Sequence, residues 1–388
     1  MASLVVLAVE ENRRCAYVRE AAARLGWAAP VVVHWRDFLA SPSALEAALD
    51  RARVMSVEGP VFLRVDSPGE DWSVERSMIA AGAGVDDADA PLAERVSEAR
   101  AQRLEFERGR VRLGRQWYLG FARALDRVAA IIEPRAEWAR ATSDPREIAT
   151  LFDKRSTHRA LRASSVRTTP LLSEGVRDAD ALRALMDERE VERVFVKPWH
   201  GSSASGVVAL SWSDGRIAAT TSAELALVEG EWALFNSLRV RRYTDERDAR
   251  RVLDALFREG AIVERWMPKA TYDGENFDLR VVTIAARARH SVVRVGRSPM
   301  TNLHLGNRRG DLQRLRARLG DDRWAKARSA AEQVARVFAR CAVLGVDVML
   351  SPNLQDASVI EANAFGDLLP NIEDEGDDTY TAMLRSLV

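Results

Sequence analysis

The sequence has few cysteines and no long apolar run. Cys15 and Cys341 are its only cysteines, too few for a disulfide framework or a Cys-rich zinc site, which indicates a reducing compartment. No apolar stretch approaches the roughly 20 residues that a membrane-spanning helix needs. The N-terminal run lacks a basic lead and soon meets Glu10 and Glu11, so it does not resemble a signal peptide. We therefore expect a cytoplasmic protein without a membrane anchor.

The sequence also lacks net charge and is poor in lysine. Its 57 basic and 57 acidic residues cancel, so no overall field would draw the chain to nucleic acid or to an anionic membrane. Only four of the basic residues are lysines, namely Lys154, Lys197, Lys269 and Lys326. Lysine carries a compact, strongly hydrated charge and arginine a flat fork. A lysine in this arginine-rich background therefore indicates a local requirement.

The 388 residues suit two or three packed units. Residues 1–135 alternate short β-type runs with helical patterns, which predicts an N-terminal α/β domain. Residues 145–262 and 263–388 mix helices with strands joined by turns, which predicts two α+β subdomains. The expected fold class is thus α/β followed by α+β.

Individual elements of the last two units can be placed from their patterns. We expect a helix over 244–259 and a strand over 261–263. A strand pair is expected over 281–286 and 291–295, and a long amphipathic helix over 322–341.

A lysine and a loop of small residues follow one expected strand. Such a loop leaves backbone N–H groups free to surround phosphate oxygens, and Lys197 would add a point charge. The spacing of Gly201 and Gly206 matches a Walker A loop, but Val207 and Val208 stand where Lys and Ser/Thr belong. An ordinary flexible hairpin is the alternative. The phosphate-binding candidates are Lys197 with the loop residues Gly201, Ser202, Ser203, Ser205 and Gly206.

Two further segments are candidates for binding the same nucleotide. Lys154 stands just before a helix, and its scarce residue type favours a phosphate contact over an ordinary surface position. Val263 and Glu264 follow a short strand and could hold the sugar and base through main-chain atoms and the carboxylate.

Three oxygen-bearing side chains lie near the C-terminal end of the sequence. Glu361 and Asn363 share one face of an expected strand because strand side chains repeat every two residues. Asp347 lies in the preceding apolar strand, where a buried carboxylate needs a partner. Together they form an incomplete oxygen shell that suits Mg²⁺. A strand pair with a polar solvent face is the alternative.

Polar residues between these segments could contact the reacting groups. Arg280 and Arg294 would neutralise charge during phosphoryl transfer, although each could also be a surface ion-pair partner. Asn302, His304 and Arg297 are candidates for substrate contacts. The two histidines near these segments lack a zinc-ligand pattern.

The order of these motifs resembles the ATP-grasp superfamily, and most closely its ribosomal-protein-modifying and lysine-biosynthesis glutamate ligases. The resemblance covers about residues 150–370. It rests on Lys154, Lys197 with its loop, Val263-Glu264, Asp278-Leu279-Arg280, Asn302-Leu303-His304, Gly345-Val346-Asp347 and Glu361-Ala362-Asn363.

This resemblance implies ATP bound between two subdomains. It implies that the lysines contact phosphates, that Glu264 lies near the ribose, and that Mg²⁺ is held by Asp347, Glu361 and Asn363. It further implies that Lys197, Arg280 and Arg294 assist phosphorylation of a carboxylate, which an amine then attacks. The loop 200–207 would close as a lid that excludes water.

Other functions remain open at this point. The same scaffold could transfer phosphate to a hydroxyl, or could bind a nucleotide without turnover. The N-terminal domain could contact a substrate through residues 66–71, which could equally be a plain surface turn. A homodimer is the commonest oligomer for enzymes of this kind. The sequence does not identify the carboxylate and amine, which could belong to a small molecule or a peptide.

Overall fold

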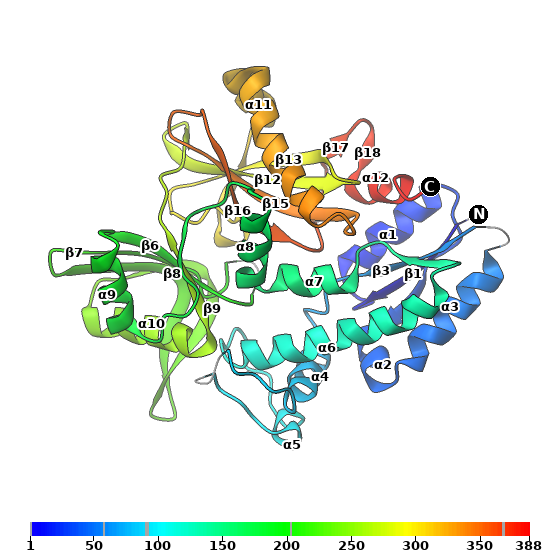
Figure 1. Ribbon diagram of the computed structural model, residues 1–388, viewed down its shortest axis with the longest axis horizontal. Helices are drawn as coiled ribbons and strands as arrows, with labels where there is room; N and C mark the ends of the chain where they lie inside the picture. Colours follow the sequence, from blue (N-terminus) through cyan, green and yellow to red (C-terminus); the bar gives the residue numbers. More distant parts are fainter. Residues whose placement is uncertain (1, 57–58, 90–92, 202–203, 367–368) are drawn as a thin grey trace.

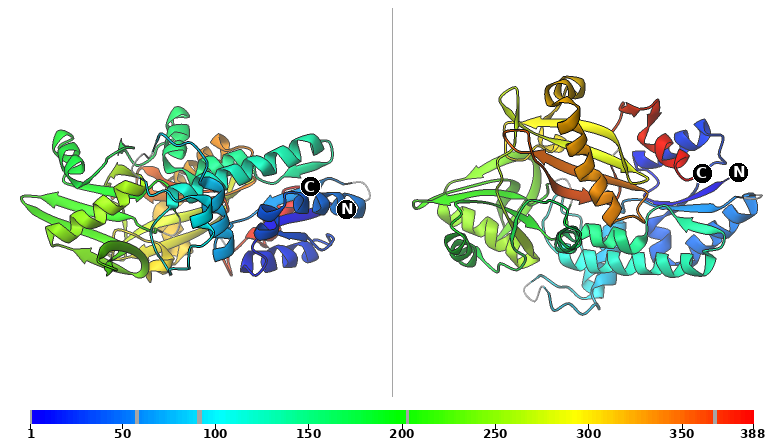
Figure 2. Two further views of the ribbon diagram at one scale, coloured as in Figure 1. Left: turned by 90° about the horizontal axis from the view of Figure 1, so that it is seen from below. Right: turned by 45° about the horizontal axis from the view of Figure 1, so that its top comes forward.

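The protein is described by a computed structural model over residues 2–56, 59–89, 93–201, 204–366 and 369–388. Three main sheets with flanking helices form the molecule (Figures 1 and 2). This arrangement confirms the expected combination of α/β and α+β structure. Among the described residues, no helix is both long and apolar enough to cross a membrane.

The first sheet is parallel and has the order β2-β1-β3-β4. Every residue of β1 (Ser3–Ala8) and β3 (Val61–Val65) is buried, as expected for parallel strands covered on both faces. The outer strands are β2 (Val31–His34) and β4 (Ala139–Ala141). The last strand lies just beyond the expected boundary at residue 135. The helices are α1 (Arg13–Arg24), α2 (Trp35–Ala40), α3 (Ser43–Met55), α4 (Trp72–Gly82), α5 (Glu98–Ala101) and α6 (Gly114–Ile132), followed by the 3-10 turn η1 (Glu133–Arg135).

The second sheet has the order β5-β10-β6-β7-β8-β9, and each of its pairs is antiparallel. Its helices α9 (Ala179–Glu188) and α10 (Glu246–Glu259) bury apolar residues against one face. The helix expected over 244–259 is thereby confirmed. The strands are β5 (Leu171–Ser173), β6 (Arg193–Pro198), β7 (Val208–Ser213), β8 (Arg216–Val228), β9 (Glu231–Tyr243) and β10 (Ala261–Arg265).

Strand β10 continues further than the sequence predicted. It was expected to end at Val263, but it pairs with β6 as far as Arg265. Both Val263 and Glu264 therefore lie inside a strand, not in the connection after it. The proposed division between 262 and 263 cuts this strand, and a division after Arg265 fits the hydrogen bonding better.

The third sheet is antiparallel, has the order β14-β13-β12-β15-β16, and carries β11 beside β12. The expected strand pair is present, but both strands are longer and their turn is at residues 285–286. The long helix covers 312–337 instead of 322–341 and bends at Gly320, where φ is 72°. The elements are β11 (Thr271–Tyr272), β12 (Glu275–Ile284), β13 (Arg287–Gly296), β14 (Arg308–Gly310), β15 (Val343–Leu350), β16 (Ala357–Asn363) and α11 (Leu312–Val337).

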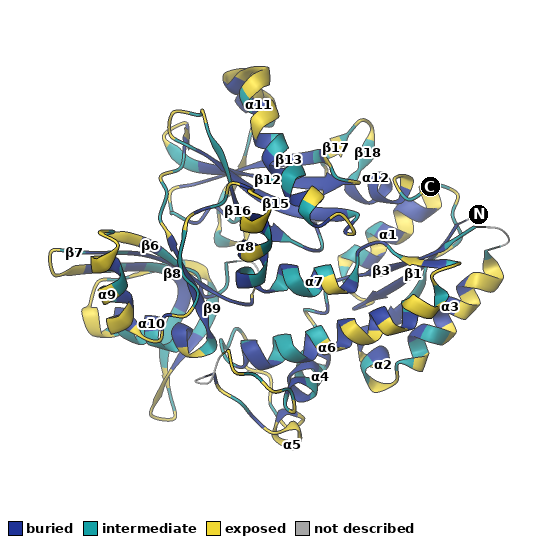
Figure 3. Ribbon diagram, viewed as in Figure 1, coloured by how far each residue is buried: buried dark blue, intermediate teal, exposed yellow. Residues whose placement is uncertain are grey.

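The remaining elements connect the sheets. Figure 1 shows α7 and α8 running between the first and third sheets, and α12 lying beside α1. One continuous apolar cluster contains residues of the first and third sheets, such as Leu7 and Leu344. In Figure 3 the strands of all three sheets are mainly buried, while the outer helices expose one side. The connecting elements are α7 (Pro145–Phe152), α8 (Lys154–Ala163), η2 (Leu303–Leu305), β17 (Glu373–Asp374), β18 (Asp377–Asp378) and α12 (Thr379–Arg385).

Candidate active site

Three neighbouring strands of the third sheet place charged side chains in one row. Arg280 on β12 is opposite Asp347 on β15, which is opposite Glu361 on β16. Directly opposed residues of an antiparallel pair point to the same face. Asn363 lies two residues after Glu361 and shares that face. The register thus brings together the three candidate metal ligands and one candidate arginine.

Asp347 is buried between two guanidinium groups. Arg280 Nη1 lies 2.8 Å from Asp347 Oδ1, and Arg294 Nη2 lies 3.0 Å from Oδ2. Burial raises the pKa of Asp347, the arginines oppose the rise, and the nearby Asp278 and Glu361 carboxylates reinforce it, so that the net direction is upward. This carboxylate is therefore in a crowded acidic environment that an additional cation would stabilise.

A second buried carboxylate, Asp278 on β12, extends the row. Arg294 Nε donates to Asp278 Oδ1 at 2.7 Å, and Lys269 Nζ donates to Oδ2 at 2.9 Å. Thr301 Oγ1 also donates to Oδ2. Burial alone would raise the pKa of Asp278, but the charges of Arg294 and Lys269 outweigh it and lower the pKa. Asp278 therefore stays ionised and fixes the position of Arg294.

Lys154 connects the row to the loop that follows β6. Its Nζ lies 3.2 Å from Glu361 Oε1 and donates to the Gly201 carbonyl oxygen at 2.9 Å. Helix α8 begins at Lys154 because the Asp153 side chain accepts hydrogen bonds from two backbone amides of its first turn. Burial would raise the pKa of Glu361, but Lys154 and Lys197 lower it.

Lys197 on β6 forms an ion pair with Glu264 on β10. Lys197 Nζ donates to Glu264 Oε2 at 2.8 Å, and His158 Nε2 lies 2.9 Å from Oε1. Thr169 Oγ1 donates to Oε2 at 2.7 Å. Burial would raise the pKa of Glu264, but Lys197 and His158 lower it to about 2. Glu264 is therefore an ionised carboxylate whose two oxygens are both engaged by protein groups.

A small cavity lies between α8, β10 and β16. Its volume is about 20 Å³, which is room for roughly one water molecule. A nucleotide is far larger, so it could occupy this position only if the second and third sheets moved apart. The charged side chains that line the cavity are Lys154, His158, Glu264 and Glu361.

The loop after Lys197 is only partly described. Ser202 and Ser203 lie outside the described residues, and Ser205 is half-buried. Gly206 has a φ of 68°, and a Cβ there would lie 3.0 Å from side-chain atoms of both Leu256 and Pro198. Glycine is therefore required at this position by both conformation and space.

The sequence itself matches a known protein family. A family model described as YheC/D like ATP-grasp matches residues 149–380, more than half of the chain and all of the row described above. The chain belongs to this family. The match confirms the superfamily, the fold and the ATP-grasp enzyme type that the order of the motifs predicted.

Solved structures with the same fold extend over the whole ATP-grasp chain. D-cycloserine synthetase DcsG is 13% identical with a TM-score of 0.51 and covers 99% of this chain and 98% of its own. ATP-grasp ligase PsnB, complexed with a minimal precursor, is 13% identical with a TM-score of 0.51 and covers 100% of both chains. Macrocyclase MdnC, bound with precursor peptide MdnA from Microcystis aeruginosa MRC, is 9% identical with a TM-score of 0.51 and covers 98% of this chain and 97% of its own. Identities this low show a shared fold only. The comparison with curated proteins found no match.

The donor set at the row fits a magnesium ion, as ATP-grasp chemistry implies. Asp347 Oδ1 is buried and accepts no hydrogen bond from the described residues, although Arg280 lies beside it as an ion-pair partner. Asn363 Nδ2 donates to the Gly345 carbonyl oxygen at 3.3 Å, which leaves its amide oxygen for a cation. Within the described ranges no group of three or more His, Cys, Asp or Glu side chains could hold a metal. Two carboxylates and an amide are the partial shell that Mg²⁺ completes with water and phosphates.

The expected substrate residues are not all gathered at the row. Arg297 has 92% of its side chain exposed and pairs with Glu275 at 3.1 Å, so it points away from Asp347. Asn302 precedes η2 and its carbonyl oxygen accepts from Asn307. His304 is exposed on that turn. Their roles in substrate binding stay predictions. Val263 has a buried side chain in the apolar core of the second sheet, so only its main chain could reach a ligand.

Two members of the site were not singled out by sequence reasoning. His158 lies four residues after Lys154 on α8, a spacing that places both on one helical face. Lys269 is one of the four lysines, and its scarcity was a usable signal. Its partner Asp278 was recognised only as part of a motif.

Proposed function

We propose that this ATP-grasp protein is an ATP-dependent carboxylate–amine ligase that works through an acyl phosphate. The γ-phosphate is transferred to a substrate carboxylate, and attack by an amine then releases phosphate and leaves an amide-type bond together with ADP. The observation that supports this best is the row of Arg280, Asp347 and Glu361 across three strands, flanked by Lys154. It combines a partial Mg²⁺ shell with cations that suit phosphates and carboxylates.

Asp347, Glu361 and Asn363 would hold the metal. Mg²⁺ would supply charge neutralisation between phosphate oxygens. Arg280 and Arg294 neutralise Asp347 at 2.8 and 3.0 Å. When a cation takes over that role, their guanidinium groups can turn to the oxygens of the phosphoryl group and the acyl phosphate.

Lys154 and Lys197 would bind the phosphates. Each now pairs with a carboxylate, Glu361 and Glu264 respectively. Binding therefore exchanges a carboxylate partner for a phosphate partner and needs no separate charge to be buried. Glu264 stays near the ribose in this proposal, and Val263 contributes main-chain atoms. The loop residues Gly201, Ser202, Ser203, Ser205 and Gly206 would cover the phosphates and exclude water from the acyl phosphate.

The first sheet would form part of the substrate site. Its strand β1 pairs with both β2 and β3, and ligands in open parallel sheets bind at the carboxyl ends of strands at such a switch point. Arg14, at the start of α1, donates to the Phe365 carbonyl oxygen at 3.1 Å, two residues beyond Asn363. This contact joins that crevice to the metal row. Asn302 and His304 are further candidates for substrate contacts.

The substrate would be a small molecule or a peptide. Similar folds include a D-cycloserine synthetase and two enzymes solved with precursor peptides. A cytoplasmic location, homodimer formation, and the absence of nucleic-acid and membrane partners stay predictions.

The deciding experiment measures ATP consumption with Mg²⁺ and pools of carboxylates and amines. We expect ADP and free phosphate to form only when one carboxylate and one amine are both present, and to be lost in Lys197→Ala. Transfer of phosphate to a hydroxyl compound without its release would instead indicate a phosphotransferase. Binding of ATP without turnover for any pair, including peptides, would contradict the ligase.

A further inference from the structure

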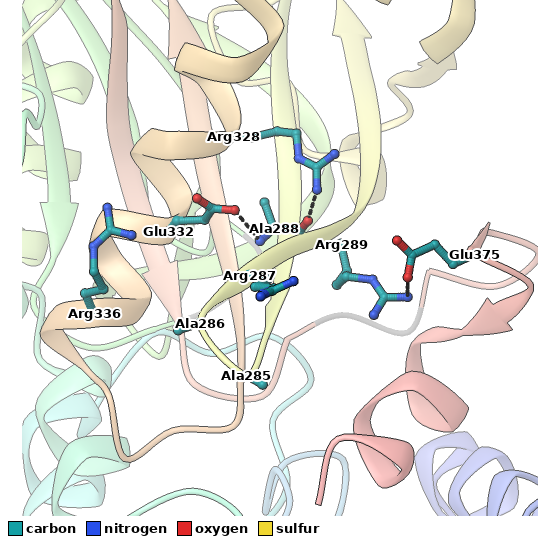
Figure 4. A pocket seen from close by; sticks show the side chains of 9 residues that line it. All are labelled: Ala285, Ala286, Arg287, Ala288, Arg289, Arg328, Glu332, Arg336 and Glu375. Atoms are coloured by element: carbon teal, nitrogen blue, oxygen red, sulfur yellow. Dashed lines mark hydrogen bonds and ion pairs between the residues drawn. The ribbon is translucent and has the colours of Figure 1, made fainter.

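A second cavity lies at the opposite end of the β12–β13 hairpin from the catalytic row. Its volume is about 580 Å³, within the range of small-molecule sites. It is formed by the turn of this hairpin, by α11 and by the loop between β17 and β18 (Figure 4). Arg287 precedes Arg294 by seven residues on the same strand, which corresponds to about 23 Å. The cavity is therefore separate from the site described above.

The charges that line this cavity are mainly positive. Four arginines and two glutamates line it, leaving an excess of two positive charges: Arg287, Arg289, Arg328, Arg336, Glu332 and Glu375. Figure 4 shows that Arg328, Glu332 and Arg336 come from one face of α11, as their spacing of four residues requires. An anion in the cavity would thus be approached from the helix and from the hairpin.

Part of this charge holds the walls in place. Arg328 donates to the Ala288 carbonyl oxygen, and Glu332 Oε1 accepts from the Ala288 amide at 3.0 Å. Arg289 Nη2 lies 2.9 Å from Glu375 Oε2, and its Nε donates to Asp374 Oδ2 at 2.6 Å. These contacts fix the hairpin against α11 and against the β17–β18 loop.

Two other arginines are not used in this way. Among the described residues, Arg287 and Arg336 have no side-chain hydrogen bond or ion-pair partner, and both are exposed. Arg287 follows a turn in which Ala285 and Ala286 have φ values of 48° and 62°. Such turns favour Asn and Gly, and a left-handed alanine costs roughly 1–2 kcal/mol. A tight turn of this kind fixes the backbone that carries Arg287.

We propose that this cavity binds a small polyanion with at least two phosphate or carboxylate groups. Guanidinium groups form paired hydrogen bonds with both kinds of oxyanion. Arg287 and Arg336 would make the direct contacts, and Arg289 and Arg328 would add positive potential while keeping the walls in place.

The test is calorimetric titration of two probes, inorganic pyrophosphate and citrate, into the full-length protein and its variants. R287A/R336A removes the two unpaired guanidinium groups. R216A/R258A is the matched control, because Arg216 is the exposed residue after the β7–β8 turn and Arg258 is exposed in the last turn of α10. The control pair therefore loses equal charge from equivalent positions.

We expect one probe to bind the wild type and the control alike, and to bind R287A/R336A at least about tenfold more weakly. Preference for pyrophosphate or for citrate then tells whether the ligand is a phosphate or a carboxylate compound. Equal binding to all three proteins overturns the proposal, as does no binding of either probe to the wild type. Lys197→Ala should keep this binding; its loss there, with retention in R287A/R336A, would assign the probe to the catalytic site and would overturn the proposal as well.

Discussion

The two ends of the β12–β13 hairpin handle charge in opposite ways. At the catalytic end Arg294 is buried and shared between Asp278 and Asp347. At the other end Arg287 is exposed and has no partner among the described side chains. A buried charge without a partner is strongly destabilising, whereas water solvates an exposed one. Ligand binding at the catalytic end must therefore exchange existing ion pairs, and at the other end it can add to groups that have none.

The largest contrast should appear in turnover when one carboxylate is removed from each end. Asp347→Asn should lower Mg²⁺-dependent phosphate release by at least about 10²-fold, because it removes a metal ligand and the charge that orients two arginines. Glu375→Gln at the arginine-lined cavity should leave turnover unchanged. Steady-state phosphate release by both variants is the measurement. Similar losses in the two would remove the functional distinction between the ends.

The next contrast is in stability and uses the scarce lysines. Lys197→Ala leaves the buried Glu264 carboxylate without its ion-pair partner and should lower the free energy of unfolding by about 3–5 kcal/mol. Lys326→Ala removes an exposed lysine on α11 and should change it by less than about 0.5 kcal/mol. Urea unfolding of both variants tests this. A small effect of Lys197→Ala would mean that the Lys197–Glu264 pair does not stabilise the fold.

The same ion pair predicts a pH dependence. The pKa of Glu264 falls from an ordinary 4.5 to about 2 in the folded state, so its stabilising contribution is present above pH 4.5 and is lost as the pH falls towards 2. The full contribution is about 3 kcal/mol. The gap in free energy of unfolding between the wild type and Glu264→Gln should narrow by about 2 kcal/mol between pH 7 and pH 3. A constant gap would show that the Glu264 carboxylate has an ordinary pKa.

The smallest effect is expected at the exposed end. Arg287→Ala should alter the free energy of unfolding by less than about 0.5 kcal/mol, because the side chain is exposed and makes no ion pair within the described structure. Thermal unfolding with and without pyrophosphate or citrate would detect the only expected change, a loss of stabilisation by the ligand. A large loss of stability in the absence of ligand would show that Arg287 is structural.

Local patterns in the sequence predicted much of the row. The two-residue repeat placed Glu361 and Asn363 on one face, and a carboxylate in an apolar strand indicated that Asp347 needs a partner. The scarcity of lysine pointed to Lys154 and Lys197, and it would have pointed to Lys269.

Contacts between distant segments could not be read from such patterns. The partner of Lys197 is Glu264, 67 residues away in another strand, and no periodicity encodes that pairing. Strand β10 was ended too early because the burial of Glu264 depends on α8 packing over it. The arginine-lined cavity draws on the β12–β13 turn, α11 and the loop near Glu375, which only the folded chain brings together.

The central claim is that Asp347 and Glu361 bind a metal together with ATP. The most direct test is calorimetric titration of ATP with and without Mg²⁺, into the wild type and into Asp347→Asn/Glu361→Gln. We predict that Mg²⁺ strengthens ATP binding to the wild type and has little effect on the double variant. Equal strengthening by Mg²⁺ in both proteins, or no binding of ATP to the wild type, would contradict the account.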